Sequence, residues 1–319
     1  MISRRLLRIK TLQILFAFFR GEGDSLSKAQ SELTHSNRKA YDLYHYLFLL
    51  LLELRDYAEK RIEIARQKHM PTHEDLHPNT RFIDNSILSI ISDNEHLRSY
   101  LGTHKLSWVN YPELVKKLYQ KVTASDYYTQ YMEATTSSFI DDKQLIVNIL
   151  SKELNNFEDF MQCLEEQSIY WVDDVDFMIG MVVKTLKKFK ENQDPSAPLL
   201  PMFKNADDED FANKLLRKVI LNHSENIKVI DKFTRNWDVE RIASMDILIM
   251  EMAICEILEF PSVPVKVSFN EYIEISKYYS TDQSSTFING VLDKIIESFR
   301  ADNHINKQGR GLLGEETEE

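Results

Sequence analysis

Residues that interrupt helices are scarce along this chain. Its 319 residues include only 8 glycines and 8 prolines, the two types that break or end helices most strongly. Few runs alternate apolar and polar side chains with the period of two that marks a half-buried strand, whereas apolar side chains recur at helical spacing. The sequence therefore predicts an all-α fold.

The first part of the sequence divides into long helical stretches. Apolar spacing predicts a helix over residues 3–20, then a short helix. Residues 36–67 predict one long helix with Ser36 as its N-cap. The apolar run Leu47–Leu54 is far too short for a membrane span, which needs about 20 apolar residues, so it indicates a buried helix segment. More amphipathic segments follow over residues 81–190.

The second part begins after a polar, proline-containing stretch. Three prolines make residues 191–206 the best candidate linker. The helices expected beyond it cover residues 207–237 as a pair, 238–260, 268–279 and 285–300. The polar tail that follows, which ends in GEETEE, is predicted to be disordered.

Charge and cysteine usage limit the classes of function. The net charge of −11 means that any nucleic-acid role must rest on a local basic patch. Cys163 and Cys255 are far apart and in no motif, which disfavours a disulfide framework and fits a reducing cytosol. The basic N-terminus lacks an apolar region followed by a small-residue cleavage site, so we expect a cytoplasmic protein without a membrane span.

The basic patch lies at the start of the first helix. Arg4, Arg5, Arg8 and Lys10 occur in the first ten residues with no acid among them. At about 100° per residue, the three arginines share roughly a third of the helix circumference, so we expect a surface helix start with its basic side outward. Basic groups oppose the dipole at a helix N-terminus. Phosphate or base binding would explain them, and a solvated first turn is the alternative.

Enzyme signatures are weak. Residues 73–77, HEDLH, match a zinc-protease motif that requires a continuous helix. Pro78 pushes His77 away from helical geometry, which favours a polar connector instead. No glycine-rich phosphate loop or G-x-S-x-G motif occurs, and the acids show no spacing of a catalytic pair. We therefore expect no catalytic residue, no metal site and no cofactor.

The last helix contains an unusual pair of residues. It begins SSTFINGVLDKI, with Ser284 or Ser285 as the expected N-cap. Gly290 inside a helix costs about 1 kcal/mol relative to alanine, so we expect another backbone to pack close to it. Phe287 lies in the first turn, as a core anchor or as a partly exposed face for a base, and Asn289 faces away from the apolar stripes.

Several motifs then recur in a family-specific order. They are Trp237 with Glu240 and Arg241, a hydrophobic helix ending in Cys255 and Glu256, the Val263-Pro264 turn, the helix Asn270–Lys277, and Phe287–Leu292. The first helix adds an R-R-x-x-R pattern followed by Gln13, Leu15 and Phe16. This order resembles the NusB family of bacterial transcription antitermination factors, well over residues 207–300 and moderately over residues 3–20.

The resemblance implies a function. It implies two small helical bundles in a non-enzymatic factor that binds boxA-type single-stranded RNA of ribosomal transcripts. It also implies a heterodimer with NusE, a small-subunit ribosomal protein, within an RNA polymerase antitermination complex. The RNA-binding residues would be Arg4, Arg5, Arg8, Gln13, Phe287 and Asn289. The partner-binding residues would be Glu240, Asp282 and Asp246, the last expected as an exposed acid on an apolar helix.

The resemblance also divides the chain. We expect the first helix of a NusB-like bundle over residues 1–20, a helical insertion or degenerate middle domain over 21–206, a NusB-like helical domain over 207–300 and a disordered acidic tail over 301–319. The expected fold is thus a NusB-like bundle with an additional helical middle region, whose role the sequence does not indicate.

Three departures from the family pattern bear on function. Glu251 follows Met250 where the family has Leu-Arg, Cys255 replaces a tyrosine, and Gln283 replaces an acid. The alternative function is therefore a NusB-like interaction scaffold in ribosome biogenesis with weak RNA binding. An RNA cytosine methyltransferase, which can carry a NusB-like domain, is disfavoured because no glycine-rich cofactor domain follows and neither cysteine follows a proline.

Overall fold

The described part of the fold consists of helices and the connections between them. The computed structural model describes residues 2–21, 25–136, 138–155, 157–234, 242–281 and 283–313, and no strand occurs among them. The prediction of an all-α fold is therefore confirmed. The chain divides into two compact units. We call Ile2–Asn37 with Phe203–Glu319 the split unit, and Arg38–Met202 the middle unit.

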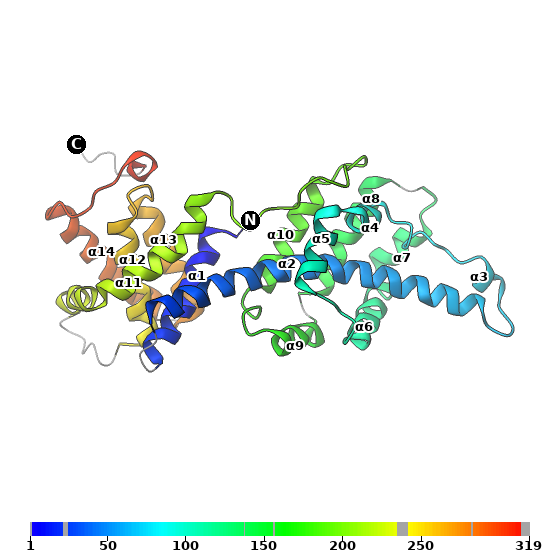
Figure 1. The fold of residues 1–319 in the computed structure, drawn as a ribbon, viewed down its shortest axis with the longest axis horizontal. Coiled ribbons are helices and arrows are strands. Elements are labelled where there is room, and N and C mark those ends of the chain that lie inside the picture. Colours follow the sequence, from blue (N-terminus) through cyan, green and yellow to red (C-terminus); the bar gives the residue numbers. More distant parts are fainter. Residues whose placement is uncertain are drawn as a thin grey trace. The chain divides into compact units, whose positions relative to one another are not determined.

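The split unit contains the first helix and the last four. They are α1 (Arg4–Arg20), α11 (Ala206–Phe233), α12 (Ser244–Glu259), α13 (Val265–Tyr279) and α14 (Ser284–Ala301). All four other helices contact α12 (Figure 1). Residues 248–257 of α12 are all buried, because a helix that is apolar on nearly every side must be surrounded. This helix is the centre of the unit.

The segment after α14 packs on the turn between α12 and α13. The backbone N–H of Gln308 donates to the carbonyl oxygen of Pro261 at 2.9 Å. A side chain at Gly311 would place its Cβ 1.9 Å from the same oxygen, so this close approach requires glycine. The disorder predicted for residues 301–319 is therefore wrong as far as Leu313. The rest of the tail lies outside the described residues.

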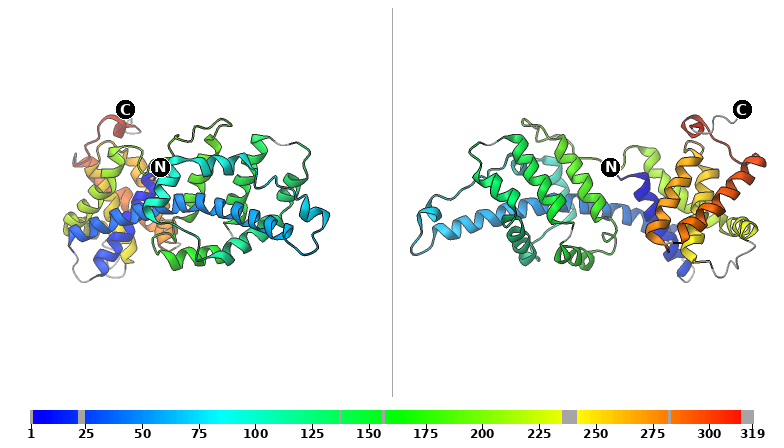
Figure 2. Two further views of the ribbon diagram at one scale, coloured as in Figure 1. Left: turned by 45° about the vertical axis from the view of Figure 1, so that its right-hand side comes forward. Right: turned by 180° about the vertical axis from the view of Figure 1, so that it is seen from behind.

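The middle unit is built on the larger part of α2 (Leu26–Arg66). Its other helices are α3 (His73–Leu76), α4 (Ser86–Asp93), α5 (Glu95–His104), α6 (Pro112–Thr123), α7 (Asp126–Glu133), α8 (Phe139–Asn148), the π-helical turn η1 (Ile149–Glu153), α9 (Glu158–Gln167) and α10 (Val175–Lys188). In Figures 1 and 2, α4, α8 and α10 lie on one side of α2, whereas α6 and α9 lie on the other.

Two tryptophans fix the core of the middle unit against α2. The ring of Trp108 stacks on Tyr46 with centroids 3.8 Å apart, and its Nε1 donates to the Tyr46 carbonyl at 3.0 Å. The Nε1 of Trp171 donates to the carbonyl of Lys39 at 2.7 Å. Both indoles thus bury a large apolar surface while their N–H groups keep a partner.

Two helices are longer than predicted. The sequence divided α2 at Ser36, but Ser36 lies inside the helix and is only 1% exposed, so it is not an N-cap. The pair expected over residues 207–237 is the single helix α11, because no glycine or proline interrupts it. The prediction that Leu47–Leu54 is a buried helix segment is confirmed, since five of its eight residues are at most 1% exposed.

Candidate nucleic-acid interface and partner surface

The arginines of α1 find their counter-charges on distant helices. No acid occurs in the first turn of α1, and Ser3 caps the helix by accepting from Leu6 N at 3.2 Å. Arg4 Nε donates to Asp208 Oδ1 at 2.8 Å. Arg5 donates to both oxygens of Glu271 at 2.8 and 2.9 Å. The side chains of Arg4 and Arg5 are 32% and 52% exposed.

Arg8 is held inside the protein. Its guanidinium donates to both oxygens of Glu256 at 2.5 and 2.8 Å, and the two side chains are 3% and 0% exposed. Glu256 also accepts from Ser268 Oγ at 2.8 Å and Tyr272 Oη at 2.7 Å. Burial, together with the charge of Glu256, raises the pKa of Tyr272 well above its usual range, so this phenol stays a donor.

The basic side of α1 is thus only partly outward. Arg8 is 2% exposed and Lys10 is 1% exposed, so the expectation that the whole basic patch faces solvent is wrong for these two. The physical reason is that the core supplies Glu256 as a buried acid for Arg8. The surface cations at the start of α1 are Arg4 and Arg5. Gln13, one turn beyond Lys10, is half-buried.

The start of α14 also differs from expectation. The residue before the helix is Gln283, and no side chain caps it, because the Ser284 hydroxyl instead donates to Asp246 Oδ2 at 2.8 Å. Nothing lies within 4 Å of a Cβ built on Gly290, so the predicted close backbone contact is wrong there. Phe287 is half-buried and Asn289 is exposed.

Asp246 is buried rather than exposed. It lies in the first turn of α12, is 5% exposed, and accepts from the hydroxyls of Ser280 and Ser284. The expectation of an exposed acid is therefore wrong, because Ser280 at the end of α13 and Ser284, the first residue of α14, satisfy this carboxylate. The other two expected partner-binding acids, Glu240 and Asp282, lie outside the described residues, as do Trp237 and Arg241 of the family pattern.

An exposed tyrosine lies on the same helix as the acid that binds Arg5, and the sequence did not bring it to attention. Tyr278 is 81% exposed. On α13 it shares a stripe of about 60° with Val267, Glu271 and Glu274, and Glu271 is the residue that holds Arg5. Tyr278 is about 10 Å along the helix axis from Glu271. Helical spacing from Glu271 could have found it, but only once its pairing with Arg5 was known.

A small apolar cavity lies between α1, α11 and α12. Its volume is about 170 Å³. It is lined by Phe16, Phe19, Arg20, His223, Ile227, Ser244, Ile247, Leu248 and Glu251. The His223 ring stacks on Phe19 with centroids 4.3 Å apart. The residues of α12 that line this cavity include Ser244 and Ile247. At about 100° per residue, Asp246 lies on nearly the opposite face of α12.

A buried acid forms one wall of this cavity. His223 Nδ1 lies 2.9 and 3.1 Å from the two oxygens of Glu251, which is 0% exposed. Burial raises the pKa of Glu251 to about 6, although the hydrogen bond and charge of His223 act in the opposite direction. Cys255, the second departure from the family pattern, accepts from Asn226 Nδ2 at 3.2 Å through its sulfur. Both departures are therefore accommodated by partners on α11.

The zinc-protease motif does not form a protease helix. The helix α3 covers only His73–Leu76, and His77 already leaves helical geometry at φ −123° and ψ 60°. In the part of the chain that the structure describes, no group of three or more His, Cys, Asp or Glu is placed to hold a metal ion. Likewise, no helix among these residues is long and apolar enough to cross a membrane.

A family model and several known proteins match part of this chain. The model of the NusB family matches residues 174–297. The transcription antitermination protein NusB of Salinibacter ruber is 42% identical over 118 residues, which are 37% of this chain and 74% of the relative. The proteins of the same name from Chloroherpeton thalassium and Alkaliphilus oremlandii are 43% and 35% identical over 33% and 28% of this chain and 50% and 64% of the relatives. No solved structure matches.

The fold and the comparisons lead to the same family. The fold alone defines the class: an all-helical protein whose arginine-bearing first helix packs on a C-terminal bundle. The chain belongs to the NusB family. The larger helical region before the matched bundle makes it a long form.

Proposed function

We propose that this chain is a transcription antitermination factor that binds boxA-type single-stranded RNA of ribosomal transcripts. The observation that carries the proposal is the placement of Arg5, a half-exposed cation at the start of α1. An exposed ion pair contributes only about 0–1 kcal/mol, so an RNA phosphate can replace Glu271 as the partner of Arg5 at little cost. Membership of the NusB family supports the same function.

The proposed RNA face extends from α1 over α13 to the start of α14. Arg4 and Arg5 would bind phosphates, and Gln13 and Asn289 would contribute hydrogen bonds. Phe287 would offer one base-stacking face, and Tyr278 would offer a second. Stacking on an aromatic side chain contributes about 1–3 kcal/mol per base. Since its guanidinium is buried against Glu256, Arg8 would act by holding α1 on the bundle.

The proposed partner surface is the apolar cavity between α1 and α12. We propose that NusE docks over Ile247 and Phe19, which line it, and that the pair then joins RNA polymerase. The partner would then dock on the helix that carries Asp246, but on nearly the opposite face of that helix. The acidic net charge of −11 suits a basic ribosomal protein. Glu240 and Asp282, which lie outside the described residues, remain part of the proposal as partner-binding acids.

The alternative is a NusB-like scaffold of ribosome biogenesis with weak RNA binding. Two observations favour it: Arg8 is unavailable at the surface, and Arg4 and Arg5 already have acidic partners. A scaffold would keep the partner surface while its RNA affinity would depend little on Arg5. The same experiment separates the two functions.

That experiment compares Arg5→Ala with Arg66→Ala, an exposed arginine of the middle unit. Arg5→Ala should weaken binding of boxA-type RNA and lower the slope of log K against log salt by about 0.7, the value for one phosphate contact on a single strand. Arg66→Ala should change neither. Titrations over a salt series, with and without NusE, provide the measurement. An unchanged slope for Arg5→Ala would leave only the scaffold.

A further inference from the structure

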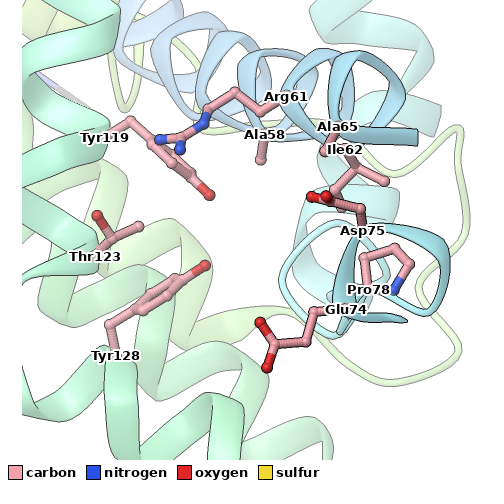
Figure 3. A pocket seen from close by; sticks show the side chains of 10 residues that line it. All are labelled: Ala58, Arg61, Ile62, Ala65, Glu74, Asp75, Pro78, Tyr119, Thr123 and Tyr128. Atoms are coloured by element: carbon pink, nitrogen blue, oxygen red, sulfur yellow. The ribbon is translucent and has the colours of Figure 1, made fainter. Parts of the chain in front are cut away.

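A second cavity lies entirely within the middle unit. Its volume is about 370 Å³, which falls in the usual range for small-ligand sites. Four elements supply its walls: α2, the segment around α3, α6 and α7. The lining residues are Ala58, Arg61, Ile62, Ala65, Glu74, Asp75, Pro78, Tyr119, Thr123 and Tyr128 (Figure 3).

Two opposite charges border this cavity from different elements. The Arg61 guanidinium, from α2, lies over the ring of Tyr119, 5.5 Å from the ring centroid. The Glu74 carboxylate, from α3, points into the cavity on the other side (Figure 3). Among the residues that the structure describes, neither charge is neutralised by an ion pair.

The other carboxylate of the cavity is already used by the fold. Asp75 Oδ2 accepts from Thr72 N at 2.9 Å, and Asp75 N donates back to Thr72 Oγ1 at 3.1 Å. Asp75 Oδ1 accepts from Lys68 Nζ at 2.8 Å. This reciprocal cap fixes the single turn of α3 and therefore fixes the position of Glu74. Glu74 is the carboxylate that remains for a ligand.

Hydroxyl groups and an apolar strip complete the lining. The hydroxyls of Tyr119 and Tyr128 both point into the cavity (Figure 3). Burial raises the pKa of the Tyr128 phenol well above its usual range, so this group keeps its proton at neutral pH and can donate to an anion. Ala58 and Ile62 lie on the same face of α2 as Arg61 and provide apolar contact.

We propose that this cavity binds a short peptide with both termini free. The carboxylate of the peptide pairs with Arg61 and accepts from the Tyr128 hydroxyl. Its ammonium pairs with Glu74, and its apolar middle lies over Ile62. An anionic ligand would face the like charge of Glu74, and a cationic ligand would face the like charge of Arg61. A zwitterion with separated ends pairs with both side chains, so charge complementarity selects this class of ligand.

The test is calorimetric titration of the full chain with leucyl-leucine and leucyl-glycyl-leucine. Two matched probes each remove one charge: N-acetyl-leucyl-leucine lacks the ammonium, and leucyl-leucinamide lacks the carboxylate. Each should bind at least tenfold more weakly than leucyl-leucine. Free leucine, in which the two charges are adjacent, should bind more weakly than the peptides.

Two variants assign each charge of the ligand to a side chain. Arg61→Met should weaken leucyl-leucine to the affinity of leucyl-leucinamide and should not weaken the amide further. Glu74→Gln should weaken leucyl-leucine to the affinity of N-acetyl-leucyl-leucine and should not weaken the acetylated probe further. Lys60→Met and Glu63→Gln, exposed neighbours on α2 that do not line the cavity, should leave binding unchanged.

Three results would overturn the proposal. One is the absence of saturable binding for both peptides, and another is tighter binding of free leucine than of either peptide. The third is an equal loss of affinity for all the probes in Arg61→Met, which would show that the Arg61 side chain does not bind the ligand carboxylate. All substituted side chains are exposed, so unchanged melting temperatures will show that each variant is folded.

Discussion

At the scale of single residues, Tyr278 and Phe287 differ in burial, and this difference separates binding from stability. Tyr278 is 81% exposed, so Tyr278→Ala should leave the free energy of unfolding within about 0.5 kcal/mol and weaken RNA binding by tenfold or more. Phe287 is half-buried, so Phe287→Ala should lower both. Tyr278→Phe, which keeps the ring, is the control. Urea denaturation and RNA titration measure the two effects, and unchanged affinity in Tyr278→Ala would remove this residue from the RNA face.

Arg8 should behave oppositely to Arg5. Arg8→Met leaves the fully buried Glu256 without its counter-charge, and breaking a buried pair in this way costs about 3–5 kcal/mol. Arg5→Ala breaks an exposed pair and should cost at most about 1 kcal/mol. Urea denaturation of both variants checks this. A cost below 1 kcal/mol for Arg8→Met would mean that Glu256 relaxes toward water or takes up a proton.

At the scale of elements, the stability contributed by the contact between α11 and α12 should depend on pH. Burial raises the pKa of Glu251 from its ordinary 4.5 to about 6, so the folded state binds more protons than the unfolded state between these values. Stability should therefore fall as pH rises from 4.5 through 6, by about 2 kcal/mol for this group. Glu251→Gln should lose this dependence, as denaturation curves across the range will show.

A control for this pH dependence comes from the other helix. His223 lowers the pKa of Glu251 by its hydrogen bond and its charge. His223→Ala should therefore move the loss of stability to higher pH. Parallel stability curves for the wild type and Glu251→Gln would contradict the assignment of the effect to this carboxyl.

The sequence predicts the helices of the split unit well, because their apolar spacing is local information. The expected stretches 268–279 and 285–300 match α13 and α14 within three residues, and the stretch 238–260 matches the end of α12 within one residue but begins six residues before its start at Ser244. The partners of polar groups are not local. Asp246 was expected to be exposed because it is an acid on an otherwise apolar helix, but Ser280 and Ser284, 34 and 38 residues later in the sequence, donate to it. Arg8 was expected at the surface because it shares a helix arc with Arg4 and Arg5, but its buried partner Glu256 is 248 residues away.

The candidate sites show the same division. Helical spacing identified Arg4, Arg5 and Phe287 as candidate RNA-binding residues, and all three are at least partly exposed in the structure. Helical spacing could not show that Glu271 pairs with Arg5 across 266 residues. It therefore missed Tyr278, which lies on the same stripe of α13 as Glu271. The cavity beside Arg61 was also missed, because its walls come from four separate elements.

At the scale of the whole molecule, the split unit is interrupted by the middle unit in sequence. Its first part ends at Asn37 and its second begins at Phe203. The buried pair of Arg8 and Glu256 joins residues 248 apart. Contacts between residues so far apart in the sequence form late in folding, because the loop between them must first be ordered.

This order has a consequence during synthesis on the ribosome. At about 5–20 residues per second, α1 is made roughly 10–50 s before the helix that carries Glu256. The middle unit is contiguous in the sequence and can fold in that interval, whereas the helices that pack against α1 have not yet been made. Leu7, Leu12 and Leu15, which are at most 1% exposed in the finished fold, face the solvent until then. The newborn chain is therefore most prone to aggregate while its first helix has no bundle on which to dock.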